Sequence, residues 1–338
     1  MPIDNFDEVK KSFQDKFRTA ASDNRAEASS AMAELAKSIE IPIRKVLLSG
    51  DIIQGIYTPE DFSNASARIE FPVDLLTPGQ EREFYAYTMP DHGMIPQRRV
   101  ESDYVMVPTF RIASSIDATL RYVRDSNWPV IARMLEILEA GFVKKMNDDG
   151  WQTILTAAYD RNIIINDADA ATGQFTPRLI VLLKSLMRRN AGGNSATLNR
   201  GRLTDIYLSP EAKDDIRSWG LDLVAAAARD NIYYSSDNGT EVMKVFDVNL
   251  NDLDELGVGQ EYQNYYSTTL GGSMDNSDNE LVVGLDRQRK DCFVMPVREQ
   301  LKIFEDNTLH RQGLFGLYGW AEHGFAVLDS RRVVLGSI

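Results

Sequence analysis

The sequence predicts an α+β fold, and three observations carry this prediction. One long stretch, residues 129–159, places apolar side chains at helical spacing. Residues 104–123 alternate apolar and polar side chains, as a strand does. From residue 280 onward the chain returns to apolar runs of strand character. The order of these elements carries more information than any short motif in the chain.

The composition is that of a folded protein. The chain has 338 residues, 43% of them hydrophobic, with a mean hydropathy of −0.30. This length predicts two or three folding units with a sizeable core. It contains no run of 18 apolar residues and no apolar segment of a secretory signal at its N-terminus. We therefore expect a protein with no membrane span. Its single cysteine, Cys292, cannot form an internal disulfide, which fits a reducing, cytoplasmic origin.

The charge balance argues against tight binding of nucleic acid. Lys and Arg total 37 against 50 Asp and Glu, which gives a formal net charge of −13. A surface that neutralises many phosphates needs the opposite excess. We therefore expect no tight binding of nucleic acid by the chain as a whole.

The first segment, residues 1–50, is predicted to be a helical arm. Phe6, Val9, Phe13 and Phe17 recur every three to four residues and form one apolar stripe. The stripe is short and its surroundings are polar, so the segment cannot bury itself. We expect it to lie against another part of the fold or against a neighbouring chain.

Residues 51–106 are predicted to form a long extended loop. Prolines punctuate short alternating runs at residues 67–73 and 83–88, which are typical of edge strands. Structureless connections of this length are uncommon inside a compact domain and usually have a function. We expect this segment to reach outward.

The long strand and the long helix come next. Residues 104–123 are predicted to form one half-buried strand. Ser126 or Asn127 can cap the following helix, Pro129 suits its first turn, and the apolar stripe runs to residue 159. Such a helix is roughly 50 Å long. Gly141 and Gly150 within it predict a bend or a close packing contact.

The central region is a mixture of short elements. Residues 160–175 are predicted to be a loop around a short strand, and Thr176 with Pro177 to begin a second helix. Residues 205–208 are predicted to be a strand, followed by a helix capped by Ser209. A further strand is expected at residues 241–248.

The sequence contains no convincing catalytic constellation. His92, His310 and His323 lack a nucleophile motif or a ligand spacing of known type, and Cys292 is typical of a small buried residue on a strand. Nucleotide-binding glycine motifs are absent too. We therefore predict no catalytic, cofactor-binding or metal-binding residue, and no cofactor.

Three passages, together with the order of the elements, resemble the major capsid protein of tailed bacteriophages, the Hong Kong 97 fold family. The likeness spans nearly the whole chain, with diffuse patterns in place of sharp motifs. The passages match the family's spine helix, the opening of its axial domain and its closing segment, and they read SNWPVIARMLEILEAGFVKKMNDDGWQTILTAA, TDIYLSPEAKDDIRSW and LHRQGLFGLYGWAEHGFAVLDSRRVVLGSI.

The resemblance implies a division of the chain into four parts. The N-terminal arm would be residues 1–50 and the extended loop residues 51–106. The peripheral domain with its spine helix would take residues 107–165 and 281–338, and the axial domain residues 166–280.

The resemblance also implies the function of a major capsid protein. The chain would assemble with itself into hexamers and pentamers of an icosahedral virion head that encloses double-stranded DNA without reading its sequence. Assembly would take place in the cytoplasm of a host bacterium. Portal, scaffold and decoration proteins would be its partners, with no membrane and no enzymatic activity.

Two departures from the family are visible. Some members join subunits by an isopeptide bond from a lysine on the extended loop, but no lysine lies between Lys45 and Lys144. Such a loop-borne cross-link is chemically unavailable here. Some members also begin with a removable scaffolding domain, for which the arm is too short. We therefore expect a separate scaffold protein, or a scaffold portion outside this sequence.

Two alternatives stay open. The first keeps the fold and makes the chain the shell of an encapsulin-type bacterial compartment that holds a cargo enzyme. The second is a cytosolic hydrolase whose general base is His92 beside Asp91, or His323 beside Glu322.

Overall fold

The structure of the chain is a computed structural model. It describes residues 52–63, 69–73, 103–119, 128–171, 173–190, 201–219, 243–274, 280–288, 291–306 and 308–338. The predicted arm at residues 1–50, the strand run at 83–88 and His92 lie outside these residues. The chain divides into two compact units. Unit 1 comprises Met1–Ile69, Met106–Gly150 and Met295–Phe325, and unit 2 comprises Glu70–Val105, Trp151–Val294 and Ala326–Ile338.

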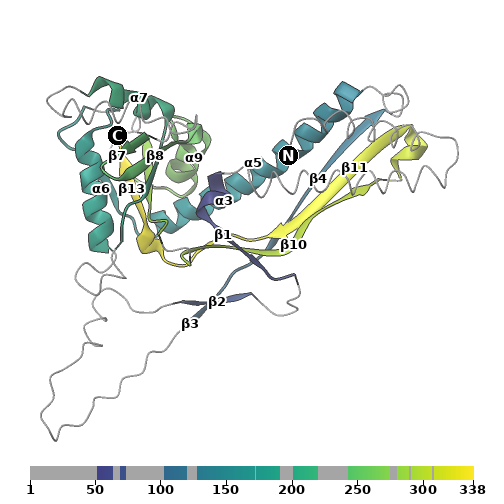
Figure 1. Ribbon diagram of the computed structural model, residues 1–338, viewed down its shortest axis with the longest axis horizontal. Coiled ribbons are helices and arrows are strands. Elements are labelled where there is room, and N and C mark those ends of the chain that lie inside the picture. The colour runs from purple at the N-terminus through teal and green to yellow at the C-terminus, as the bar shows by residue number, and fades with distance from the viewer. Residues whose placement is uncertain are drawn as a thin grey trace, which may run out of the picture. The chain divides into compact units, whose positions relative to one another are not determined.

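Most of a five-stranded sheet belongs to unit 1. Its strands follow the order β1-β10-β11-β4, and β12 pairs with β10 off this path. Figure 1 shows β10 and β11 as a long paired ribbon with β4 beside it. The strands are β1 (Thr58–Asp61), β4 (Phe110–Thr119), β10 (Phe293–Glu305), β11 (Leu314–His323) and β12 (Ala326–Val327).

The register of this sheet gives it two different faces. β11 pairs antiparallel with β4 without interruption, from Leu314 opposite Thr119 to His323 opposite Phe110. Because successive side chains on a strand point to opposite faces, every second residue of β11 lies on the same side. Leu317, Gly319, Ala321 and His323 are buried, whereas Tyr318, Trp320 and Glu322 are partly exposed. One face of the sheet therefore packs inward and the other meets solvent.

The predicted long helix is confirmed as α5 (Trp128–Tyr159). Within unit 1 it buries Leu138, Phe142 and Met146, and its Gly150 accepts a hydrogen bond from Tyr57 Oη at 3.0 Å. Tyr57 follows the short helix α3 (Ile52–Ile56). The start of the segment predicted to be a loop is therefore helical and packed, because the side chains of Ile53 and Ile56 are buried.

The prediction of one strand over residues 104–123 is wrong. The structure has two strands, β3 (Asp103–Met106) and β4, with three residues between them. Pro108 lies in this gap, and a proline cannot donate a ladder hydrogen bond. β3 pairs instead with β2 (Glu70–Val73) in a separate two-stranded sheet.

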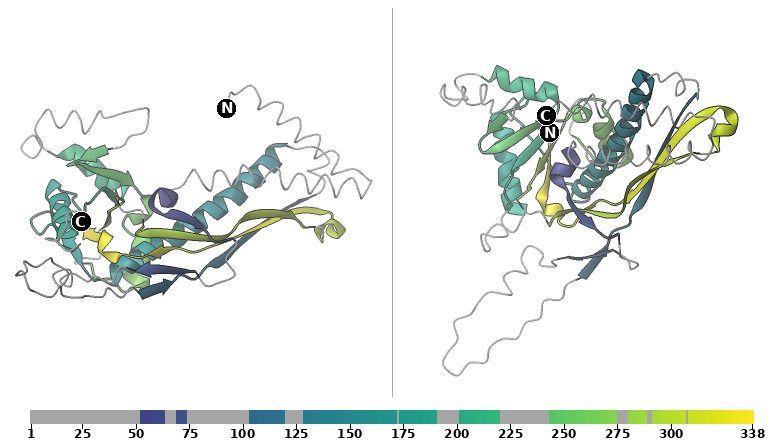
Figure 2. Two further views of the ribbon diagram at one scale, coloured as in Figure 1. Left: turned by 60° about the horizontal axis from the view of Figure 1, so that its bottom comes forward. Right: turned by 45° about the vertical axis from the view of Figure 1, so that its right-hand side comes forward.

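A six-stranded sheet forms the centre of unit 2. Its strand order is β5-β13-β9-β6-β8-β7, with parallel pairs β13–β5 and β6–β8 and antiparallel pairs elsewhere. Figure 2 gives two further views of the whole ribbon diagram. The strands are β5 (Ile164–Asn166), β6 (Asp205–Leu208), β7 (Met243–Val245), β8 (Val248–Asp252), β9 (Leu281–Leu285) and β13 (Val333–Ser337).

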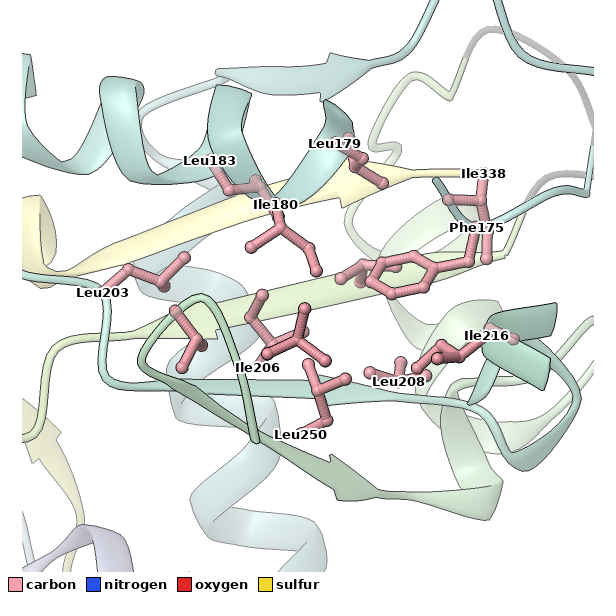
Figure 3. Close-up of a cluster of buried hydrophobic side chains, with 14 of the residues drawn as sticks. Phe175, Leu179, Ile180, Leu183, Leu203, Ile206, Leu208, Ile216, Leu250 and Ile338 are labelled. Atoms are coloured by element: carbon pink, nitrogen blue, oxygen red, sulfur yellow. The ribbon is translucent and has the colours of Figure 1, made fainter. Parts of the chain in front are cut away.

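Helix α6 (Pro177–Asn190) begins where it was predicted to begin, and it covers this sheet with an apolar stripe. Thr176 Oγ1 accepts the amide hydrogen of Leu179 at 3.3 Å and caps the helix start. Figure 3 shows Leu179, Ile180 and Leu183 facing side chains from β6 and β8. All three are fully buried, so unit 2 has its own core.

The second predicted cap is also confirmed. Ser209 accepts the amide hydrogen of Ala212 at 3.1 Å at the start of α7 (Pro210–Ser218). Ala212 and Ile216 of this helix and Trp219 directly after it are buried. The remaining helical turns are η3 (Asp254–Leu256), α9 (Glu261–Asn264), η4 (Tyr265–Thr269), η5 (Leu309–Gln312) and η6 (Ser330–Arg332).

The prediction of one strand at residues 241–248 is wrong. β7 and β8 form a hairpin whose turn residues Phe246 and Asp247 have φ angles of 51° and 64°. Two central residues with positive φ are typical of a type I′ turn, which usually contains Asn or Gly. Phe246 gives no such signal, and the turn was therefore not visible in the sequence.

Candidate interaction surface

The predicted chemistry-bearing histidines do not form a site in the described residues. His92 and the side chain of His310 lie outside them. The His323 side chain is 5% exposed, and its ring meets Phe325 edge-on at a centroid distance of 5.3 Å. Burial lowers the pKa of this imidazole below its ordinary 6.5, and the charge of Asp149 opposes that effect only in part. His323 is therefore a neutral side chain packed inside unit 1.

Glu322, the proposed partner of His323 in a hydrolase, belongs to the opposite face of β11. Its carboxylate accepts a hydrogen bond from Thr109 Oγ1 at 2.8 Å. It also lies 3.6 Å from Arg298 Nη1 and 3.9 Å from Arg111 Nη2. Neighbouring residues on a strand point to opposite faces, so this carboxylate does not orient the imidazole.

The remaining candidate, Cys292, is buried as expected. Its side chain is 2% exposed, and its carbonyl oxygen accepts the amide hydrogen of Leu328 at 2.8 Å. Across the described ranges, no three His, Cys, Asp or Glu side chains gather as they would around a metal ion.

Three aromatic side chains form a ladder on the solvent-facing side of the long ribbon. Phe304 of β10 lies directly opposite Tyr318 of β11, with ring centroids 5.6 Å apart. Its ring also stacks on Trp320 at 4.6 Å, and Tyr318 and Trp320 are 5.7 Å apart. Cross-strand aromatic pairs stabilise a sheet beyond the area that they bury. We call these three residues the aromatic ladder.

Charged side chains continue the same face beyond the ladder. The guanidinium carbon of Arg111 lies 5.7 Å from the Trp320 ring centroid, a cation–π distance. Lys302 Nζ donates to Glu299 Oε1 at 2.7 Å, which lowers the pKa of that carboxyl. Arg111 Nη2 is 3.7 Å from Glu299. This face thus combines a stacked aromatic centre with a charged margin, the composition of many protein interfaces.

A second exposed apolar group lies on β3. Tyr104 and Met106 are 61% and 55% exposed, and Val105 between them is 45% exposed. Tyr104 and Met106 are two residues apart on the strand and so share one face, and contiguous exposed apolar side chains mark interaction sites in soluble proteins. A two-stranded sheet is also only marginally stable alone. These residues therefore fit a surface that another protein covers.

The sequence predicted neither surface in this form. Tyr318 and Trp320 are two residues apart on an expected strand, which places them on one face. Phe304 joins them only through the register between β10 and β11, and that register contains two irregularities between Val297 and Lys302. No local signal gives such a pairing, so the ladder could not be derived from sequence alone.

Comparison with solved structures identifies the fold. The chain resembles the "Capsid of empty GTA particle" with a TM-score of 0.51 and 11% identity, over 85% of this chain and 89% of that one. It resembles the "Cyanophage Pam1 capsid asymmetric unit" with a TM-score of 0.52 and 8% identity, over 84% and 88%. The chain has a capsid-protein fold.

A solved encapsulin complex also resembles the chain. The holo-SrpI encapsulin complex from Synechococcus elongatus matches with a TM-score of 0.51 and 12% identity, over 87% of this chain and 86% of that one. No protein-family model and no curated protein matches the sequence. No helix among the described residues combines the length and apolar content that a membrane crossing requires.

Proposed function

We propose that this chain is the major capsid protein of a tailed bacteriophage and assembles with itself into an icosahedral shell around double-stranded DNA. The observation that carries the proposal is the likeness to solved capsid structures over more than four fifths of both chains. A match of that extent includes parts of both compact units, so it is more than the likeness of one short motif.

The exposed apolar surfaces support this function. In the single chain the aromatic ladder is partly exposed, and the apolar side chains of β3 are strongly exposed. In a closed shell, every subunit repeats the same contacts with its neighbours, so many weak contacts add up to a stable assembly. Surfaces of this kind suit a subunit that is stabilised by copies of itself.

The proposal includes the division of the chain into the four parts of the Hong Kong 97 fold. The arm at residues 1–50 and the loop at 51–106 would contact neighbouring subunits. Residues 107–165 and 281–338 would form the peripheral domain, and residues 166–280 the axial domain at the centre of hexamers and pentamers. A separate scaffold protein, a portal and decoration proteins would complete a virion assembled in the host cytoplasm.

The proposal assigns the chain no catalytic role. The packing of His323 supports this, because the imidazole is buried and Glu322 turns to the other face of the strand. The excess of acidic residues also suits a lining that encloses DNA without holding it tightly.

The encapsulin-type compartment is the second candidate, and the SrpI complex is the observation that favours it. The TM-scores of the phage and encapsulin structures are nearly equal, so the fold does not separate the two. Genes for a terminase and a portal beside this one would support the phage. A gene for a peroxidase or a ferritin-like protein would support the compartment.

Sedimentation velocity of the full chain, alone and co-expressed with neighbouring genes, tests the shell function. The proposal predicts a fast, narrow boundary from closed particles in at least one of these preparations. A monomer or dimer in all of them would contradict it. A double substitution of His92 and His323 by Ala distinguishes the shell protein from the hydrolase. It should abolish any hydrolysis that depends on these histidines, whereas a shell protein should still assemble.

A further inference from the structure

Strand β4 is a long edge of the unit 1 sheet. It has 10 residues, and among the described strands only β11 is paired with it. Edge strands of this length are usually protected by a proline, a bulge or charged side chains, because their free backbone groups can pair with another strand. The sequence of β4, FRIASSIDAT, contains no proline, and its pairing with β11 has no register shift. Its two charged residues, Arg111 and Asp117, have opposite signs and so do not repel a second copy of the strand.

The side chains of β4 are arranged symmetrically about Ser114. In an antiparallel pairing of two copies centred on this residue, Arg111 of one copy lies opposite Asp117 of the other. The same register places Ile112 opposite Ile116 and Ala113 opposite Ser115. Residues directly opposite one another share a face of the sheet and interact. The strand is therefore complementary to itself in both charge and apolar character.

The exposures fit this pairing. Arg111, Ala113, Ser115 and Asp117 belong to the exposed face of β4, and the side chain of Arg111 is 59% exposed. The backbone of Asp117 pairs with Gly316 of β11, but its side chain has no hydrogen bond or ion pair with any described residue. Arg111 reaches Glu299 and Glu322 only at 3.7 and 3.9 Å. The Asp117 carboxylate of a second copy could therefore approach the Arg111 guanidinium, which is still accessible to solvent.

We propose that β4 is an interface with a second copy of this chain, in which two β4 strands pair antiparallel about a two-fold axis at Ser114. The two sheets become one continuous sheet, and each copy contributes the same patch, as a two-fold interface requires. The inference rests on the proposed shell function, since closed icosahedral shells contain two-fold axes. It specifies which strand of this chain lies on such an axis.

A cysteine at the centre of the pairing tests the register. In Ser114→Cys the two new thiols would face each other at the axis, where the Cα atoms of opposed antiparallel residues are about 4.5–5.5 Å apart. A disulfide needs about 4.4–6.8 Å between Cα atoms. We expect a covalent dimer under mild oxidation on a non-reducing gel. The native Cys292 is buried, and the unsubstituted chain controls for it.

Thr119→Cys is the matched control. Residue 119 lies five positions from Ser114, so the residues 119 of the two chains lie on opposite sides of the axis. At about 3.3 Å for each residue, they would be about 33 Å apart along the strands. This variant should stay monomeric on the same gel. Mixing Ala113→Cys with Ser115→Cys should cross-link the two chains to one another, since these positions are opposed across the axis.

The charge pair has its own test. The pair occurs twice across the axis, and an opposite-charge pair contributes about 0.2–1 kcal/mol. Asp117→Asn should therefore reduce the association of two chains about twofold to thirtyfold. Asp117→Arg should weaken it further, because Arg would then face Arg111 of the other copy. The yield of the Ser114→Cys dimer measures both effects.

The outcomes separate this interface from the shell function. Closed particles without the Ser114→Cys dimer would overturn the β4 pairing and leave the shell standing. The dimer without particles would support the pairing and contradict the shell. Equal cross-linking of Thr119→Cys would show an unspecific contact and overturn the pairing, as would the absence of both dimer and particles.

Discussion

Arg332 donates a hydrogen bond from Nη1 to Asp286 Oδ2 at 2.7 Å, and the two side chains are only 2% and 1% exposed. Asp286 also accepts the amide hydrogens of Arg202 and Gln288, at 3.0 and 3.1 Å. This buried charge pair joins Asp286, the residue after β9, to Arg332 in the helical turn before β13. The attraction between the two charges offsets the free-energy cost of removing each of them from water.

Removal of one partner should therefore be costly. Arg332→Met leaves a buried carboxylate without its cation, which typically lowers the free energy of unfolding by about 3–5 kcal/mol. Chemical denaturation of the wild type and the variant measures the difference. Lys145→Met is the control, since the Lys145 side chain is 54% exposed in its pair with Asp149 and its loss should cost at most about 1 kcal/mol. Equal effects would refute a special role of the buried pair.

The two glycines within α5 should respond oppositely to alanine. A Cβ on Gly141 meets nothing within 4 Å, so Gly141→Ala should stabilise the chain by about 1 kcal/mol through helix propensity. A Cβ on Gly150 would lie 2.7 Å from Ile53 Cδ1 and 2.9 Å from its Cγ2. Gly150→Ala should therefore destabilise by about 1–3 kcal/mol, as overpacking of a core does.

Thermal unfolding of both variants checks this pair. The prediction requires a rise in Tm for Gly141→Ala and a fall for Gly150→Ala. A rise for both would mean that Ile53 moves aside at no cost, and that the contact between α3 and α5 is loose.

His323 should make stability depend on pH. Its pKa is lowered by burial, so the unfolded state binds a proton near pH 6.5 while the folded state stays neutral. The free energy of unfolding then falls as the pH drops below about 6.5, by at most about 1.4 kcal/mol per pH unit, until the folded-state pKa is reached. Above that window the imidazole is neutral in both states and contributes no pH dependence.

Denaturant titrations from pH 5 to pH 8, with His323→Gln as the comparison, isolate this group. The difference in stability between the two proteins should change across the window and be constant above it. A constant difference at every pH would show that His323 does not resist protonation in the folded chain.

The aromatic ladder should contribute to stability through its stacking. Phe304→Ala removes two ring contacts, with Tyr318 and Trp320, each worth about 0.5–1.5 kcal/mol beyond buried area. We therefore expect a loss of about 1–3 kcal/mol in denaturation at low protein concentration. Phe246→Ala, at a turn where the side chain is 49% exposed, is the control and should change little. A similar loss for both would argue against the ladder.

Helix positions were predictable because their signals are local. Thr176 and Ser209 cap helices within three residues of themselves, and both caps are present as expected. The stripe of α6 is likewise contained within the helix that it defines. Such features depend on neighbours in the sequence and on little else.

The strands were harder to predict for two different reasons. Pro108 separates β3 from β4, but apolar and polar side chains alternate on both sides of it and so resemble one continuous strand. The turn at Phe246 and Asp247 carries no glycine, and positive φ angles there are imposed by the pairing of β7 with β8. The aromatic ladder and the symmetric edge of β4 require register or pairing, which single-strand patterns do not contain.

The central claim is that this chain assembles with itself into a closed shell. Negative-stain electron microscopy of the purified full chain, alone and with a co-expressed scaffold, tests it most directly. The account predicts round particles of uniform size, tens of nanometres across. Isolated single subunits in every field, under every assembly condition, would contradict it.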